Sequence, residues 1–257
     1  MPLLNFKQAG SGENLILIHG LFGSMDNLNM VSRTLAKSYC VTNIDVRNHG
    51  DSFQKNNMSY SELAQDVIEL LDHLVIDSCA ILGHSMGGKI AMQIALEHHQ
   101  RVNKLIVADI APVAYPAHHQ KIILGLKAID LSKVNNRKDA DQQLAYYVKD
   151  HGVRQFLLRN LAKNDHETDE YHFKCALNYI SECYPQIMLG YQGNSTFHGK
   201  TLFIKGGNSN YITAAHRPII SKLFPNSKAK IINDAGHWLH AEKSVAFNKI
   251  VSDFLIA

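Results

Sequence analysis

The sequence has little that would mark a membrane, secreted or nucleic-acid-binding protein. In its 257 residues no apolar stretch approaches the roughly 20 residues that a membrane-spanning helix needs. Its N-terminal segment shows no basic region followed by a long apolar segment and a cleavage site, so we expect no signal peptide. No block of like charges appears, and a formal net charge of +3 gives nucleic acid little to bind.

Cysteine is scarce as well, and the few thiols have no metal-ligand spacing. We expect them to be reduced and mostly buried, which predicts a cytoplasmic protein with no metal and no other cofactor. The four residues are Cys40, Cys79, Cys175 and Cys183. A hydrophobic content of 46% with 19% charged residues indicates a folded chain rather than a disordered one.

Short apolar runs alternate with longer amphipathic segments along the chain. The runs are rich in Leu, Ile and Val, as expected of parallel strands covered on both faces. They lie at 15–19, 40–45, 79–83, 104–109, 201–205 and 229–233. Helices are predicted at 59–75, 86–99 and 242–256, the first with a capping box formed by Ser59 and Glu62. This alternation predicts an α/β fold with an open, mostly parallel sheet flanked by helices.

The alternation stops between residues 112 and 199. This segment contains helical patterns and no convincing strand, and a loop of that length without structure would be unusual. We expect three or four helices there, within 118–133, 139–152, 152–164 and 169–184. The predicted organisation is a core made of residues 1–111 and 200–257, with a helical cap inserted at 112–199.

A candidate nucleophile lies where a predicted strand turns abruptly into a helix. Residues 83–87 read Gly-His-Ser-Met-Gly, a G-x-S-x-G pattern centred on Ser85. In such a turn the serine backbone is strained and bulkier residues two positions either side would collide, so glycine is favoured at both. The turn presents the serine hydroxyl above the sheet, in front of free N–H groups at the helix N-terminus.

A serine hydroxyl needs a base, and His237 is the favoured one of 15 histidines. It follows the last predicted strand and comes after Ser85, as the order serine–acid–histidine requires. His84 more plausibly supports the turn, and His240 lacks the companions that a metal site shared with His237 would need. The remaining candidates, His98, His99, His118 and His119, are expected on solvated helix surfaces.

Acyl transfer also requires donors for an oxyanion. One should be the N–H of Met86, the residue after the nucleophile. The other should come from the loop after the first predicted buried strand, residues 19–24, where Leu21 or Phe22 is the candidate.

Taken together, six segments resemble the α/β-hydrolase superfamily and, within it, the YbfF-type esterases. They are residues 19–28, 44–52, 83–89, 109–115, 206–212 and 235–243, in order and properly spaced. The resemblance implies an α/β-hydrolase fold, a serine esterase and an acid that follows the strand next to the nucleophile strand, which here is Asp109. The predicted cap resembles nothing so specific, and we expect it to set substrate choice.

The position of the acid needs its own argument, because residues 200–212 contain no Asp or Glu where this fold often has one. Neighbouring parallel strands direct their carboxyl ends at the same crevice, so Asp109 could reach His237. Asp109 could instead cap a turn, in which case Asp234 is the main rival. Ser209 stands where the acid is missing; it could bond His237 or Asp109 as a fourth member, or be an ordinary turn residue.

These residues predict a serine carboxylesterase of the carboxylic ester hydrolase type, acting on short- to medium-chain acyl esters through an acyl-enzyme on Ser85. An acyl-CoA thioesterase and a carbon–carbon bond hydrolase of the same fold remain alternatives. A small-molecule ester or thioester is the expected partner, with no membrane or nucleic acid, and the oligomeric state stays open. The candidate substrate pocket contains Phe22, Phe156, Leu157, Met188 and Trp238.

Overall fold

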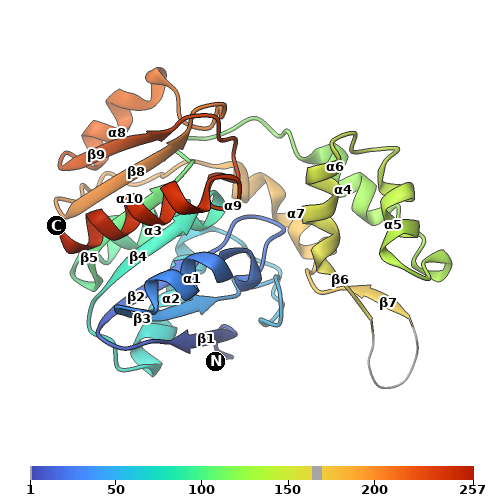
Figure 1. Cartoon of the computed structure of the whole chain (residues 1–257), viewed down its shortest axis with the longest axis horizontal. Helices are drawn as coiled ribbons and strands as arrows, with labels where there is room; N and C mark the ends of the chain where they lie inside the picture. The colour runs from blue at the N-terminus through green and yellow to red at the C-terminus, as the bar shows by residue number, and fades with distance from the viewer. Residues whose placement is uncertain (1, 164–169) are drawn as a thin grey trace.

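The computed structural model describes residues 2–163 and 170–257. They form a seven-stranded sheet in the order β1-β3-β2-β4-β5-β8-β9 (Figure 1). Only β1 runs antiparallel to its neighbour; the other neighbouring strands are parallel. The strands are β1 Phe6–Ala9, β2 Glu13–Ile18, β3 Tyr39–Ile44, β4 Cys79–His84, β5 Val102–Ala108, β8 Lys200–Gly206 and β9 Ser227–Ile232. The predicted fold class, a mostly parallel sheet flanked by helices, is confirmed.

The six predicted strands all exist, with ends within two residues of those expected. The middle strands β2, β4 and β5 are buried over most of their length, as their continuous Leu, Ile and Val require. Strand β1 was not predicted, because it lies at the sheet edge and most of its residues are exposed. It therefore lacks the apolar signal of the others.

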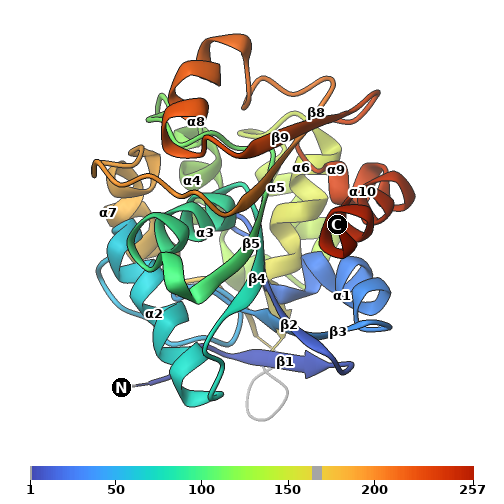
Figure 2. The same ribbon diagram turned by 90° about the vertical axis from the view of Figure 1, so that its left-hand side faces the viewer.

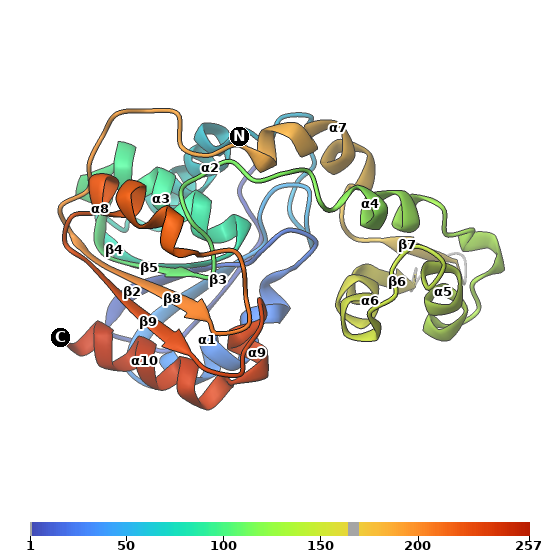
Figure 3. The ribbon, with the colours of Figure 1, turned by 90° about the horizontal axis from the view of Figure 1, so that it is seen from above.

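Helices cover both faces of the sheet, and each face has its own hydrophobic cluster. Figures 2 and 3 show α1 and α10 on one face and α2, α3 and α8 on the other. The helices are α1 Asn29–Leu35, α2 Tyr60–His73, α3 Met86–Glu97, α8 Arg217–Leu223, α9 Leu239–Glu242 and α10 Ser244–Ile256. No helix of the described residues is both long and apolar enough to cross a bilayer.

The capping box expected at the start of α2 is only half formed. Ser59 Oγ does accept the N–H of Glu62, at 3.4 Å. The Glu62 carboxylate turns instead to the guanidinium of Arg47, which also forms a paired contact with Asp66. Arg47 is buried, so its charge requires these carboxylates, and this demand outweighs the local helix cap.

The described residues of the predicted insertion, 112–163 and 170–199, include a group of short elements beside the sheet (Figure 1). Its helices are α4 Gln120–Lys127, α5 Arg137–Leu144, α6 His151–Leu157 and α7 Leu177–Met188. The expectation of no strand here is wrong, because β6 Leu161–Lys163 and β7 Tyr171–Phe173 pair as a two-stranded sheet. The helices expected at 152–164 and 169–184 are therefore wrong at one end each, because residues 161–163 and 171–173 are strand. Residues 164 and 169 lie outside the described residues.

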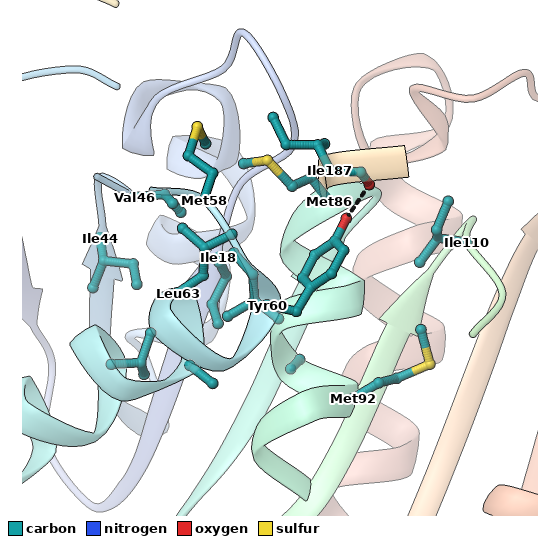
Figure 4. Packing of buried hydrophobic residues seen from close by; sticks show 14 of the residues in the cluster. Ile18, Ile44, Val46, Met58, Tyr60, Leu63, Met86, Met92, Ile110 and Ile187 are labelled. Carbon is teal, nitrogen blue, oxygen red and sulfur yellow. Dashed lines mark hydrogen bonds between the residues drawn. The ribbon is translucent and has the colours of Figure 1, made fainter. Parts of the chain in front are cut away.

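The C-terminal end of α7 joins this group to the core. Tyr60 Oη donates to the carbonyl oxygen of Ile187 at 2.7 Å, inside the cluster of buried side chains drawn in Figure 4. Lys89 Nζ, on α3, donates to the carbonyl of Leu189 at 2.6 Å. Within the group itself, the Tyr115 N–H donates to the carbonyl of Met188 at 2.9 Å. Whether residues 112–199 act as a cap stays a prediction.

Candidate active site

The turn between β4 and α3 has the strained geometry that its sequence predicts. Ser85 adopts φ 55° and ψ −119°, a left-handed backbone that costs energy for a residue with a Cβ. A Cβ on Gly83 would collide with the backbone of Gly87, and a Cβ on Gly87 would collide with the carbonyl of Ile18. Both glycines are therefore required. The Ser85 side chain lines a cavity at the carboxyl ends of the strands.

Ser85, His237 and Asp109 form one hydrogen-bonded array. His237 Nε2 lies 2.9 Å from Ser85 Oγ, and His237 Nδ1 lies 2.8 Å from Asp109 Oδ2. An ionised carboxylate only accepts, so the proton belongs on Nδ1 and Nε2 is left to accept from the serine hydroxyl. This is the arrangement of a serine nucleophile with its base and orienting acid.

Asp109 lies at the carboxyl end of β5 and is fully buried. Its backbone has φ 52°, and its N–H donates to the carbonyl of Ile204 at 2.8 Å. The Gly206 N–H donates to Oδ1 at 3.0 Å, and the hydroxyl of Ser209 donates to Oδ2. Asp234, the rival candidate, is exposed and in a left-handed turn. The geometry thus brings Asp109 to His237 and puts Ser209 against the acid.

The loop after β2 supplies the oxyanion candidates, and two buried histidines fix its backbone. The Phe22 N–H donates to His49 Nε2 at 3.1 Å, which argues against Phe22 as an oxyanion donor. Among the described residues, the N–H groups of Leu21 and Met86 have no protein acceptor. Leu21 and Met86 are therefore the better candidate pair.

The two histidines, His19 and His49, must be neutral to accept backbone N–H groups at Nε2. His49 Nδ1 lies 3.0 Å from the carbonyl of Arg47, so Nδ1 carries the proton and Nε2 accepts. His19 likewise donates from Nδ1 to Gly20 and accepts the Val46 N–H at Nε2. Burial lowers the pKa of His19 to about 4 and, with the nearby His19, that of His49 to about 3. The sequence argument missed both residues, although each precedes a glycine after a predicted strand.

A cavity of about 260 Å³ opens in front of Ser85. Four of the five predicted pocket residues line it: Phe22, Phe156, Leu157 and Trp238. The rings of Phe156 and Trp238 lie 5.3 Å apart and close one side. Met188 instead lines a much smaller void that Ser85 also borders. The cavity therefore has walls from the core and from residues 112–199.

Two of the other histidines lie differently from their predicted positions. His118 and His119 precede α4 and line the cavity rather than a helix surface. His84 donates from Nε2 to the carbonyl of His237 at 2.9 Å, so it does support the site, and burial lowers its pKa. His240 packs its ring 4.4 Å from that of His84. In the part of the chain that the structure describes, no group of three His, Cys, Asp or Glu residues could hold a metal ion.

Comparison with known proteins agrees with this geometry. Residues 13–244 match the family model for the alpha/beta hydrolase fold. A putative esterase/lipase of Haemophilus influenzae is 39% identical over 98% of this chain and 88% of its own length. Esterase YbfF of Escherichia coli is 35% identical over 94% of this chain and 92% of its own. The solved structure of a marine microorganism esterase, 39% identical, superposes with a TM-score of 0.95 over 99% of this chain and 100% of its own. The chain therefore belongs to the α/β-hydrolase family, and its predicted relation to the YbfF-type esterases is confirmed.

Proposed function

We propose that this chain is a serine carboxylesterase that uses Ser85, His237 and Asp109 as a catalytic triad. The observation that carries the proposal is the continuous hydrogen-bonded array from Asp109 through His237 to Ser85, at the floor of a partly apolar cavity. Two proteins with esterase in their names match this chain over nearly its whole length, which adds independent support.

In the proposed reaction, Ser85 Oγ attacks the ester carbonyl as His237 Nε2 takes its proton. The N–H groups of Leu21 and Met86 stabilise the resulting oxyanion. The tetrahedral intermediate collapses when the alkoxide leaves with the proton from His237, which leaves an acyl group on Ser85. Water, deprotonated by the same imidazole, then releases the acid and restores the serine.

We further propose that residues 112–199 act as a cap that shapes the acyl site. Phe156 and Leu157, from α6, face the cavity together with Trp238 from the core. A cavity of about 260 Å³ is small for this kind of site, since ligand pockets commonly have about 300–1,000 Å³. This favours short- to medium-chain acyl groups over long ones.

The test is a panel of p-nitrophenyl esters from acetate to decanoate, run beside the matching acyl-CoA thioesters. We expect ester hydrolysis with a preference for the shorter chains, and stoichiometric labelling of Ser85 by a fluorophosphonate. Labelling at another residue, or full activity in Ser85→Ala, would remove the nucleophile assignment. Faster turnover of the thioesters at equal chain length would replace the esterase with a thioesterase.

A further inference from the structure

The aromatic ring of Tyr211 lies against the imidazole of His237. Their centroids are 3.9 Å apart and the planes are inclined by 21°, which is a stacked arrangement. Tyr211 follows β8 in the same loop as Ser209, and its N–H donates to Ser209 Oγ at 3.2 Å. One loop therefore contacts the acid through Ser209 and the base through Tyr211.

The hydroxyl of Tyr211 is bound by two histidines of residues 112–119, here called the lead segment. His118 Nε2 lies 2.6 Å from Tyr211 Oη. His118 Nδ1 lies 2.7 Å from the carbonyl of Pro116, so Nδ1 carries the proton and Nε2 accepts from the tyrosine. This leaves Tyr211 Oη with lone pairs for a second partner.

That partner is His119, and the donor directions follow from Tyr184 on α7. The His119 N–H donates to Tyr184 Oη at 2.8 Å, so Tyr184 can donate to His119 Nδ1 at 3.0 Å. His119 Nε2 then carries the proton and points it at Tyr211 Oη, 3.4 Å away. A consistent chain of hydrogen bonds runs from α7 through the lead segment to the ring on His237.

The protonation states of His119 and Tyr211 in this chain are fixed at neutral pH. Burial lowers the pKa of His119 to about 3, so this imidazole stays neutral. Burial, together with Tyr184 and Asp109, raises the pKa of Tyr211 to about 12, so the phenol keeps its proton. Two fixed partners at the hydroxyl hold the Tyr211 ring in its plane.

We propose that Tyr211 is a positioning residue for His237, held in place by its hydrogen bonds with His118 and His119; the inference rests on the proposed esterase function. The imidazole has to stay in the plane that joins Asp109 to Ser85 while it gains and loses a proton. The flat ring blocks rotation out of that plane. Its electron-rich face also attracts the imidazolium more than the neutral imidazole, so the contact strengthens in the transition state.

Three variants test the role of the ring. Tyr211→Leu removes the stacking surface, Tyr211→Phe keeps it and loses only the hydroxyl, and Tyr146→Leu is the matched control at an exposed tyrosine of the insertion. Turnover and KM are measured on a p-nitrophenyl ester, per active site titrated with a fluorophosphonate. We expect Tyr211→Leu to lower kcat by about tenfold with little change in KM. Tyr211→Phe should lose about two- to threefold, and the control nothing.

Two other outcomes would contradict the inference, and a third would contradict the proposed function. If Tyr211→Leu gives fewer titratable sites but an unchanged kcat per site, the ring is merely structural and the inference is wrong. If Tyr211→Phe loses as much as Tyr211→Leu, the hydroxyl acts rather than the stacked ring, and the inference is again wrong. A wild-type protein that hydrolyses no ester at all overturns the proposed function instead, so the two failures are distinguishable.

Discussion

The candidate triad lies at the carboxyl ends of the central strands. This region is built differently from the insertion at residues 112–199. At these strand ends specific groups contact one another: Asp109 is fully buried and receives hydrogen bonds from Gly206, the last residue of β8, and from Ser209 in the loop after it. The insertion is joined to the core by both backbone and side-chain contacts. The carbonyls of Ile187 and Leu189 accept from Tyr60 and Lys89, and Asn160 Nδ2 donates to the carbonyl of Phe22.

This difference has a consequence for what each region tolerates. Any residue offers a carbonyl, so the contacts of Tyr60 and Lys89 with residues 187 and 189 can persist when the side chains at those two positions change. Lys89 is buried beside the rings of Tyr60 and Tyr115, and burial lowers its pKa to about 7. Single substitutions in the candidate triad should therefore abolish most of the turnover. Substitutions in the insertion should instead change which substrates are preferred.

The largest effect is expected from Asp109→Asn. The amide keeps the size of the side chain but favours the wrong imidazole tautomer, so turnover should fall on the order of 10⁴-fold, or about 5 kcal/mol of transition-state stabilisation. Steady-state kinetics on a p-nitrophenyl ester measure the loss, with Asp234→Asn at the exposed rival position as the control. Ser209→Asp added to Asp109→Asn should restore part of the rate. Near-normal turnover in Asp109→Asn alone would contradict the assignment of the acid.

A change in the insertion should alter substrate preference instead. Phe156→Ala removes one wall of the cavity beside Trp238 and makes room for longer chains. We expect the ratio of kcat/KM for the octanoate ester over the acetate ester to rise about tenfold, because a methylene in an apolar pocket carries differences of this size. Leu124→Ala, at an exposed position of α4, is the control. An unchanged chain-length profile would mean that the acyl site lies elsewhere.

A third prediction concerns the buried neutral histidines behind the oxyanion loop. The folded-state pKa values of His19 and His49, about 4 and about 3, lie below the usual 6.5. The unfolded chain therefore binds protons that the folded chain excludes. The free energy of unfolding is therefore at its full value above about pH 6.5. It decreases as pH falls from there toward 4, by about 1.4 kcal/mol per pH unit for each histidine.

Urea denaturation between pH 5 and pH 8 measures this dependence through the free energy of unfolding. His49→Gln keeps an acceptor for the Phe22 N–H and should reduce the slope by the share of one histidine. His73→Gln, at an exposed position of α2, should leave the slope unchanged. An identical slope in His49→Gln would show that His49 does not exclude a proton in the fold.

The parts of the molecule that sequence could predict are those with a local physical cause. The Leu, Ile and Val runs predict parallel strands because both faces of such strands are buried, and the two glycines around Ser85 predict the turn because side chains there would collide. The contact between Asp109 and His237 could be anticipated because neighbouring parallel strands end at the same side of the sheet. The first two inferences need only neighbouring residues, and the third needs one rule of sheet geometry.

The missed features depend on contacts between distant segments. Strand β7 is only three residues long and exists through its pairing with β6. His118 and His119 follow Pro116 and carry no sign that the Tyr211 hydroxyl will lie between them. The choice between Leu21 and Phe22 required the hydrogen bond to His49, 27 residues further along the chain. Such contacts are invisible until the chain has folded.

The smallest effect should come from Ser209, which tests how much support the acid needs. Its side chain is buried, donates to Asp109 and accepts the Tyr211 N–H. Ser209→Ala leaves the carboxylate bonded to Gly206 and His237, so the triad can still form. We expect kcat to fall about tenfold at most, since one hydrogen bond to a charged group is lost in an otherwise intact site. Ser221→Ala, an exposed serine of α8, should have no effect. A loss close to that of Asp109→Asn would give the hydroxyl equal weight with the acid, whereas unchanged kinetics would make Ser209 a simple turn residue.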